Sequence, residues 1–447
     1  MTIKSCFGLA VLISACAEPD AADSVTEPVI EEARAVSASA SLTANDCVES
    51  AETSDDHHQL PNNRPFRDPS GWSATFSTAG SIDLGSPFFA DLGSNGRTCE
   101  SCHKIDAGWT ISAANTRRLF DVTRGTAAIF RTVDGSNSPD ADVSTLRKRR
   151  AAYGMLLNRG TIRVGIGIPE GADFELTAVD DPYGFASAAQ LSLFRRPLPA
   201  TNLGFGSVVM WDGRVTGASL QEALAAQANG ATQGHAQRTT PLDQATRDAI
   251  VGFETGLFTA QLVDRDVGPL TVNGGRGGAE ALAGQPIVAG RWDLFDAYQA
   301  SSDPKVQAIY RGQELFNTRP RSNGKSSCQG CHSRSNVGTN DHGAFFNIGT
   351  SAATRREADQ PLYTLTEIAT GTVVQSTDPG RALITGKFAD VGRFKVPSLR
   401  GLAARAPYFH GGSARTLADV VAFYVEDLAF AFTDDEAADL QAFLAAL

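Results

Sequence analysis

The hydrophobic positions of the chain form short periodic segments, separated by polar and glycine-rich stretches. Residues 161–166 and 174–179 are rich in β-branched and apolar residues, as is typical of strands. Other segments repeat their apolar positions at helical spacing. The expected helices are 219–228, 241–262, 303–316 and 434–447. The pattern predicts a mainly α protein with some β structure in its first half.

The N-terminus has the pattern of an export signal. Lys4 supplies a positive charge, and Phe7–Ala15 is an apolar stretch. At about nine residues, that stretch is too short to span a bilayer as a helix. Ile13–Cys16 resembles a bacterial lipobox, which predicts a lipoprotein-type signal over 1–16; the alternative is an ordinary signal cleaved after Ala17. Either reading predicts a periplasmic protein of the cell envelope. The lipoprotein reading adds attachment to the membrane, and only through a lipid anchor.

The rest of the chain divides by composition. Residues 17–62 are rich in small and acidic residues and cannot bury a core, so we expect a flexible tether. Two domains are then expected, 63–290 and 303–447, and the run that closes the first is rich in glycine. The stretch from about 120 to 200 holds the strand-like fragments and is predicted to be an insertion in the first domain.

Charge and composition limit the function classes. The 447 residues are 42% hydrophobic and 20% charged, which indicates a globular protein rather than a membrane bundle. The net charge of -11 argues against nucleic acid as a partner, because phosphate binding needs a basic face. A basic redox partner would be favoured, since complementary charge speeds encounter.

Two copies of the pattern C-x-x-C-H carry the strongest chemical information. In this pattern two thiols add to the vinyl groups of one haem, and the adjacent histidine is carried under the ring to the iron. A zinc site of four thiolates would need both cysteine pairs to meet, and it would leave both histidines unexplained. The sequence therefore predicts an exported c-type cytochrome with two covalently bound haem c groups. Their residues are Cys99, Cys102, His103, Cys328, Cys331 and His332.

The sixth iron ligand decides whether each haem carries electrons or performs chemistry. Methionine is usual in high-potential electron carriers, but only Met155 and Met210 remain after the signal. No methionine follows the second motif. Candidates at the second haem are His342, His410 and Tyr424, and distant histidines for the first are His57, His58 and His235.

Longer motifs accompany the two haem patterns. They are Phe205–Met210, Trp211–Arg214, Gly392–Gly401 and Ala406–Ser413. Together they resemble the bacterial di-haem cytochrome c peroxidase and MauG-like superfamily, over about 85–110, 195–240 and 305–447. The resemblance implies two cytochrome c-like haem domains, with the insertion and the tether outside the family pattern.

The resemblance assigns roles to individual residues. Trp211 matches a tryptophan that lies between the haems and relays electrons. His235 falls where the family places an acid/base residue, usually glutamate, so it either moves protons at a vacant site or ligates the iron. Leu119 stands where many of the peroxidases have a blocking histidine, which implies an open first haem.

At the second haem the resemblance points to Tyr424. It lies 14 residues after His410, where the peroxidases place a methionine ligand and MauG-like proteins place a tyrosine. Tyr424 is therefore the expected sixth ligand, and His410 is an expected haem-binding residue or an alternative ligand.

The family also holds a calcium ion between its haems. Two of its ligands are backbone carbonyls that match Arg405 and Pro407. The matching asparagine side chain is replaced here by Arg196, which leaves calcium as an open expectation.

Three functions are compatible with these features. The leading one is a peroxidase that reduces hydrogen peroxide with electrons from a cytochrome c or a small copper protein. The second is a MauG-like oxidase that acts on side chains of a partner protein, which Tyr424 favours. The third is a non-enzymatic electron carrier with two closed haems.

Overall fold

The structure is a computed structural model that describes residues 58–447 except 323 and 325. The expected signal, His57 and nearly all of the predicted tether lie outside the described residues. The described residues belong to one compact unit. None of the helices in this described range combines the length and the apolar character needed to cross a membrane.

The largest sheet lies outside the predicted insertion. Its order is β2-β3-β8-β9, and all neighbours are antiparallel. The strands are β2 (Pro65–Asp68), β3 (Gly71–Ser77), β8 (Leu257–Asp264) and β9 (Gly268–Pro269). Most residues of β3 are buried, and the strand lies between β2 and β8 in the sheet. The first half therefore contains more β structure than the insertion alone was expected to supply.

The helix expected over 241–262 is partly wrong. Helix α6 covers Gln244–Thr255, and the chain then continues as β8. Asp243 caps the helix, because its side chain accepts a hydrogen bond from the backbone N–H of Thr246. The apolar residues that follow pair with β3 along its whole length. A short apolar run in the sequence does not distinguish a buried strand from a helix. In this segment, pairing with β3 favours the strand.

A further short pair of strands precedes the sheet. Strand β1 (Gln59–Pro61) is antiparallel to β4 (Ser81–Asp83). It lies within the segment 17–62 that was expected to be tether, so regular structure begins earlier than composition indicated.

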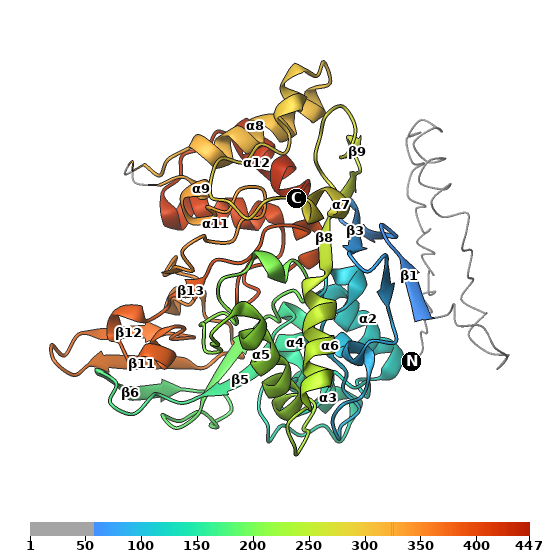
Figure 1. Ribbon diagram of the computed structural model, residues 1–447. Helices are drawn as coiled ribbons and strands as arrows, with labels where there is room; N and C mark the ends of the chain where they lie inside the picture. Colours follow the sequence, from blue (N-terminus) through green and yellow to red (C-terminus); the bar gives the residue numbers. More distant parts are fainter. Residues whose placement is uncertain (1–57, 323, 325) are drawn as a thin grey trace, which may run out of the picture. The chain divides into compact units, whose positions relative to one another are not determined.

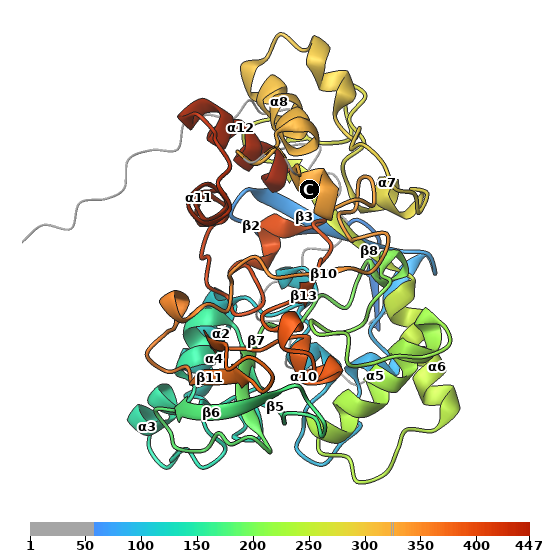
Figure 2. The same cartoon turned by 90° about the vertical axis from the view of Figure 1, so that its left-hand side faces the viewer.

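The predicted insertion folds onto the C-terminal half. The expected strands are confirmed as β5 (Ile162–Ile166) and β6 (Phe174–Asp180). Strand β5 pairs with β7 (Leu191–Arg195), whereas β6 pairs with β11 (Leu362–Glu367) across nearly two hundred residues. Strand β12 (Val373–Ser376) completes this sheet, and Figures 1 and 2 show β6 beside β11. The other helices in this part of the chain are α2 (Ala113–Thr123), α3 (Leu146–Ala152) and α4 (Gly154–Arg159).

Two helices form the core of the C-terminal part, and both were predicted. Helix α8 covers Pro304–Thr318 and α12 covers Asp434–Ala445, and they pack against each other (Figure 1). Their apolar sides enclose Trp292, Phe316 and Phe443. Helix α11 (Leu417–Leu428) packs beside α12. The expected helix over 219–228 is also confirmed, as the longer α5 (Leu220–Gly234).

The remaining elements are short. They are α7 (Ala279–Ala283), α9 (Cys328–Cys331), α10 (Ala382–Thr385), β10 (Phe345–Phe346), β13 (Phe394–Lys395) and several single-turn 3-10 helices. The glycine-rich run that closes the first expected domain contains α7 and β9 and packs against the sheet, so it is part of the fold.

Candidate functional site

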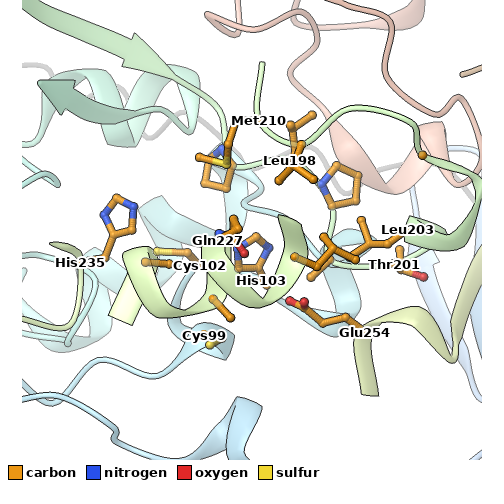
Figure 3. A pocket seen from close by; sticks show the side chains of 18 of the residues that line it. Cys99, Cys102, His103, Leu198, Thr201, Leu203, Met210, Gln227, His235 and Glu254 are labelled. Carbon is orange, nitrogen blue, oxygen red and sulfur yellow. The ribbon is translucent and has the colours of Figure 1, made fainter. Parts of the chain in front are cut away.

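The residues of the first C-x-x-C-H motif line a large cavity, which we call the first pocket. Cys99 begins the 3-10 turn η3 (Cys99–Ser101), which Thr98 caps through a reciprocal pair of hydrogen bonds with Ser101. The turn brings both thiols and the imidazole of His103 to one wall of the pocket (Figure 3). The empty space in the pocket, including space open to solvent, is about 1610 Å³.

The second motif lines a similar cavity, which we call the second pocket. Cys328 and Cys331 are the first and last residues of α9, and His332 follows directly. The pocket holds about 1300 Å³ of empty space, again including space open to solvent. Most of its other lining residues are apolar and come from the segment after Phe394 and from α11 and α12.

Both motif histidines are oriented by a backbone carbonyl. The Nδ1 atom of His103 lies 3.0 Å from the carbonyl oxygen of Trp109, and Nδ1 of His332 lies 2.5 Å from that of Gly338. Because a carbonyl only accepts, Nδ1 carries the proton and Nε2 keeps its lone pair. Burial lowers the pKa of each imidazole to about 4, so both are neutral near pH 7. A neutral imidazole with a free Nε2 is the form that binds iron.

These features fit a haem in each pocket. Two thiols, one pre-oriented imidazole and an apolar cavity occur together twice, in the places where the motifs predicted them. Burial also raises the pKa of Cys99 to about 12 and that of Cys102 to about 11, so the unmodified thiols are neutral.

His235 lies in the first pocket, at the C-terminal end of α5 (Figure 3). Its Nδ1 atom lies 2.5 Å from Oδ2 of Asp134, and Arg97 forms an ion pair with the same carboxylate. Asp134 and Arg97 are buried, whereas the His235 side chain is 37% exposed. Burial alone would raise the pKa of Asp134, but the hydrogen bond with His235 and the charge of Arg97 outweigh it, and the pKa is lowered.

Sequence reasoning missed Asp134 and Arg97. Asp134 belongs to the predicted insertion and is separated from His235 by 101 positions. No motif marks it, and only the fold brings the two side chains together. Arg97 stands two residues before the first motif, but its sequence neighbours give no sign of a buried partner.

Further side chains that carry nitrogen, oxygen or sulfur atoms line the first pocket. Met210, Gln227 and Glu254 line it (Figure 3). Burial raises the pKa of Glu254 to about 8, so its carboxyl group is largely protonated near neutral pH. The histidines among the lining residues are His103 and His235.

Other candidates for the first haem lie outside this pocket. Met155 is buried but does not line the pocket, and Leu119, which does not line it either, packs against the apolar cluster that Cys102 also contacts. His58 is exposed and does not line the pocket.

The second pocket brings Tyr424 and His410 together with His332. Tyr424 projects from α11, and burial raises the pKa of its phenol. His410 is 4% exposed, and its ring stacks on Phe394 with the centroids 3.8 Å apart. The third candidate, His342, does not belong here: its side chain is 85% exposed, pairs with Asp341 and does not line the pocket.

Trp211 lines both pockets. Its indole N–H donates to the carbonyl oxygen of Arg196 at 2.8 Å, and its own carbonyl accepts from the backbone N–H of Lys395 at 2.9 Å. The indole ring lies 6.3 Å from the ring of His410. The tryptophan is therefore held at both its side chain and its backbone, between the two cavities.

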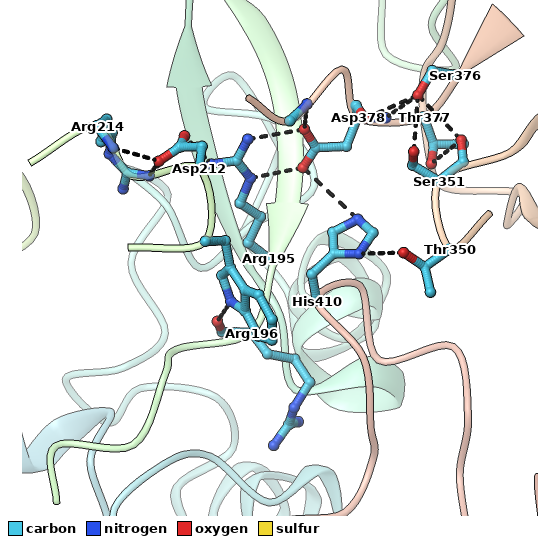
Figure 4. Close-up of polar contacts among 12 residues, drawn as sticks. Arg195, Arg196, Asp212, Arg214, Thr350, Ser351, Ser376, Thr377, Asp378 and His410 are labelled. Atoms are coloured by element: carbon cyan, nitrogen blue, oxygen red, sulfur yellow. Dashed lines mark hydrogen bonds and ion pairs between the residues drawn. The ribbon is translucent and has the colours of Figure 1, made fainter. Parts of the chain in front are cut away.

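A buried ion network includes Asp212, the residue that follows this tryptophan in the chain (Figure 4). Arg195 donates to Asp212 at 2.5 Å and to both oxygens of Asp378 at 2.7 and 2.9 Å. All three side chains are at most 2% exposed. His410 joins the network, with Nε2 3.9 Å from Asp378 and Nδ1 3.2 Å from the hydroxyl of Thr350. Strong buried pairing of this kind fixes the segments that carry Trp211 and His410.

Several known proteins are similar to this chain at low sequence identity. No family model matches the chain. The cytochrome-c peroxidase IdrP1 of Denitromonas iodatirespirans is 31% identical over 174 residues, which cover 34% of this chain and 44% of that protein. The peroxidase IdrP2 of the same organism is 27% identical over 259 residues, covering 55% of this chain and 66% of that protein. The methylamine utilization protein MauG of Methylorubrum extorquens is 28% identical over 277 residues, covering 57% of this chain and 64% of that protein.

The matched regions thus span 44% to 66% of the length of these relatives. A solved structure of a MauG-like protein associated with microbial copper homeostasis aligns with 89% of this chain and 95% of its own, at 18% identity and a TM-score of 0.41.

The curated relatives are named as cytochrome-c peroxidases and as MauG, and such relatives imply haem c cofactors. Their agreement with the two C-x-x-C-H pockets supports an oxidoreductase family. Over the matched regions, the chain is similar to proteins of the superfamily of di-haem cytochrome c peroxidases and MauG-like proteins, and these matches support that relationship.

Proposed function

We propose that this chain is a peroxidase that converts one hydrogen peroxide and two protons into two waters, using two electrons. The electrons come one at a time from a donor cytochrome c or a small copper protein. The observation that carries the proposal is that Trp211 lines both C-x-x-C-H pockets. An aromatic side chain in contact with both cavities suits a two-site enzyme in which electrons enter at one site and peroxide reacts at the other.

The residues that would hold the cofactors follow from the geometry. Cys99 and Cys102 would attach one haem covalently, with His103 as the iron ligand through Nε2. Cys328, Cys331 and His332 would do the same in the second pocket. When bound, the two haems supply the redox chemistry, with peroxide reacting at the first site and the donor delivering electrons to the second.

His235 is the proposed acid/base residue. Its Nδ1 is engaged by Asp134, which leaves Nε2 to exchange protons with peroxide in the first pocket. Both protons of the reaction must reach peroxide oxygens, and an imidazole with a nearby carboxylate is suited to pass them on. If His235 instead bound the iron, the first site would be closed to peroxide.

The main test is peroxide turnover with a panel of reduced donors, in the wild type and in Trp211→Phe. Electron delivery through the second site should slow in the variant while both haems remain attached. Trp72→Phe is the matched control, because Trp72 lies in β3 and lines neither pocket. Equal turnover in Trp211→Phe and the wild type, with intact haem spectra, would remove the basis of the proposal.

A MauG-like oxidase is the second candidate, and Tyr424 in the second pocket favours it. In that case peroxide would withdraw electrons from side chains of a partner protein rather than from a donor cytochrome. Adding peroxide with and without a reduced donor separates the two functions. Carbon monoxide binding separates both from a pure electron carrier, since a carrier with two closed haems would bind none.

The location of the protein is part of the proposal. The residue pattern of 1–16 and the tether composition lead us to place it in the periplasm, held at a membrane by a lipid. Mass spectrometry of the N-terminus of the mature protein tests this directly, because lipidated Cys16 would become the first residue.

A further inference from the structure

One buried arginine connects several segments in the region between the two pockets. Arg196 follows β7 and is 5% exposed. Its Nη2 donates to the carbonyl oxygens of Ile111 at 2.7 Å and Arg405 at 2.9 Å, and its Nη1 donates to that of Arg159 at 3.2 Å. The three acceptors come from three distant parts of the chain, so the guanidinium joins them through main-chain contacts.

The backbone of Arg196 makes two further connections. Its carbonyl oxygen accepts the hydrogen bond from the indole of Trp211, and its N–H donates to the carbonyl oxygen of His410 at 2.6 Å. The same residue therefore holds the tryptophan that lines both pockets and the histidine that lines the second.

This is the position where the family resemblance implies a calcium ligand, and the residues present do not fit calcium. The carbonyl of Arg405, one of the expected ligands, already accepts a hydrogen bond from Arg196. Calcium prefers six to eight oxygen ligands, including carboxylates. Among the described residues, no group of three or more His, Cys, Asp or Glu side chains could hold a metal ion.

The local charge also opposes a cation. The guanidinium of Arg405 is 5% exposed, and its Nε donates to the carbonyl oxygen of Gly108 at 3.1 Å. Within the described residues, neither Arg405 nor Arg196 forms an ion pair with a carboxylate. Proximity to Arg196, after burial, lowers the pKa of Arg405 to about 9, which indicates two cationic groups close together. A divalent ion would add further like charge at low dielectric.

We propose that the guanidinium of Arg196 takes the place of the calcium ion, so that the arrangement between the two pockets is independent of metal. A planar cation with several donors satisfies the carbonyl of Arg405, which a calcium ion would otherwise bind, together with those of Ile111 and Arg159. Because the side chain is covalently part of the protein, the junction persists at any calcium concentration.

The first test uses the wild-type holoprotein. Its calcium content is measured by mass spectrometry after gel filtration in calcium-free buffer, and its thermal unfolding midpoint is measured in EGTA and in calcium chloride. We expect no bound calcium and the same midpoint in both solutions. One calcium per chain, or a midpoint that falls in EGTA and recovers with calcium, would overturn the proposal. Neither readout depends on peroxide turnover, so this test and the proposed function can fail separately.

The second test removes the guanidinium. Arg196→Met keeps an unbranched side chain but leaves three buried carbonyls without their donor, so the midpoint should fall. Electron transfer between the haems after pulse reduction should slow as well, because the support of Trp211 shifts. Arg400→Met is the matched control, since Arg400 is fully buried and donates to the carbonyl of Asn336 outside both pockets.

In the control we expect a lower midpoint with unchanged inter-haem transfer. An Arg196→Met protein with wild-type midpoint and wild-type transfer would refute the role of the guanidinium. Equal slowing in both variants would assign the effect to general destabilisation and would also count against the proposal.

Discussion

His235 shows how a single side chain in the first pocket depends on partners that the sequence does not reveal. The C-x-x-C-H residues were found by spacing, because the chemistry of haem attachment requires neighbouring residues. Trp211 and Tyr424 were found through longer motifs. Asp134 and Arg97 carry no local pattern, since their contact with His235 arises only when the predicted insertion folds over the first motif.

The first prediction at this scale concerns Asp134→Asn. The amide would keep the shape but lose the charge that holds the imidazole of His235. We expect the reaction with peroxide to slow roughly 10-fold to 100-fold, the range found when a group that orients a functional histidine is removed. Stopped-flow mixing with peroxide measures this rate.

The control for that variant is Asp142→Asn. Asp142 lies in the same segment but is exposed and pairs only with Lys148. It should react with peroxide like the wild type. A wild-type rate in Asp134→Asn, with a folded protein and full haem content, would show that the carboxylate is not needed.

The second prediction concerns Tyr424→Phe. If the phenolate binds the iron of the second haem, its loss changes the coordination and raises the reduction potential, because an anionic oxygen ligand favours the ferric state. Low-temperature spectra of the oxidised protein and a redox titration measure both changes. Tyr408→Phe serves as the control, since Tyr408 lines the same pocket but donates to the carbonyl of Leu402.

An unchanged potential and six-coordinate spectrum in Tyr424→Phe would make tyrosine ligation wrong. His410 would then become the preferred ligand of the second haem, because it is the other histidine in that pocket besides His332.

At the scale of elements, local pattern predicted where strands and helices occur better than what they pair with. The strands near 161 and 174 and the helices at both ends of the C-terminal part are confirmed. The switch from α6 to β8 was missed because burial in the sheet overrides a helical pattern. The pairing of β6 with β11 was not predictable, since nothing in either sequence names its partner.

That pairing leads to the third prediction. Leu365 in β11 is fully buried in the cluster that also contains Phe174 of β6. Leu365→Ala should lower the free energy of unfolding by about 3 kcal/mol, as expected for a cavity in a packed core. Urea unfolding followed by far-UV circular dichroism measures the loss.

Val373→Ala is the matched control, because Val373 lies in the same sheet but is 56% exposed. Its free energy of unfolding should stay within about 0.5 kcal/mol of the wild type. Similar losses of unfolding free energy in both variants would mean that the buried cluster contributes no more to stability than an exposed position of the same sheet.

At the scale of the whole molecule, the two C-x-x-C-H pockets share one compact unit, and Trp211 lines both. The described residues form this unit without a break at the glycine-rich segment. The two-domain boundaries therefore stay a prediction from the motif repeat. The sequence predicted two sites from the repeated motif. The family motif pointed to Trp211 as the residue between them, and the fold places Trp211 in the lining of both pockets.

The net charge gives the fourth prediction. At -11, the protein should attract a basic donor over several ångströms, within a Debye length of about 8 Å at physiological salt. With a basic donor cytochrome, kcat/KM should fall as sodium chloride increases. Steady-state oxidation of the donor measures it, and an acidic donor should show no such fall. A salt-independent rate with the basic donor would exclude steering by net charge.

The sheet that joins β6 to β11 has a consequence for biosynthesis. The strand at 174–180 is made long before its partner at 362–367. At the usual 5–20 residues per second, the interval is roughly 10–40 seconds. During that time the edge of β6 is open and the three-stranded sheet is incomplete. Strands β11 and β12 can join β6 only after residue 376 has been made, so the N-terminal part of the chain spends that interval without this contact to the C-terminal part.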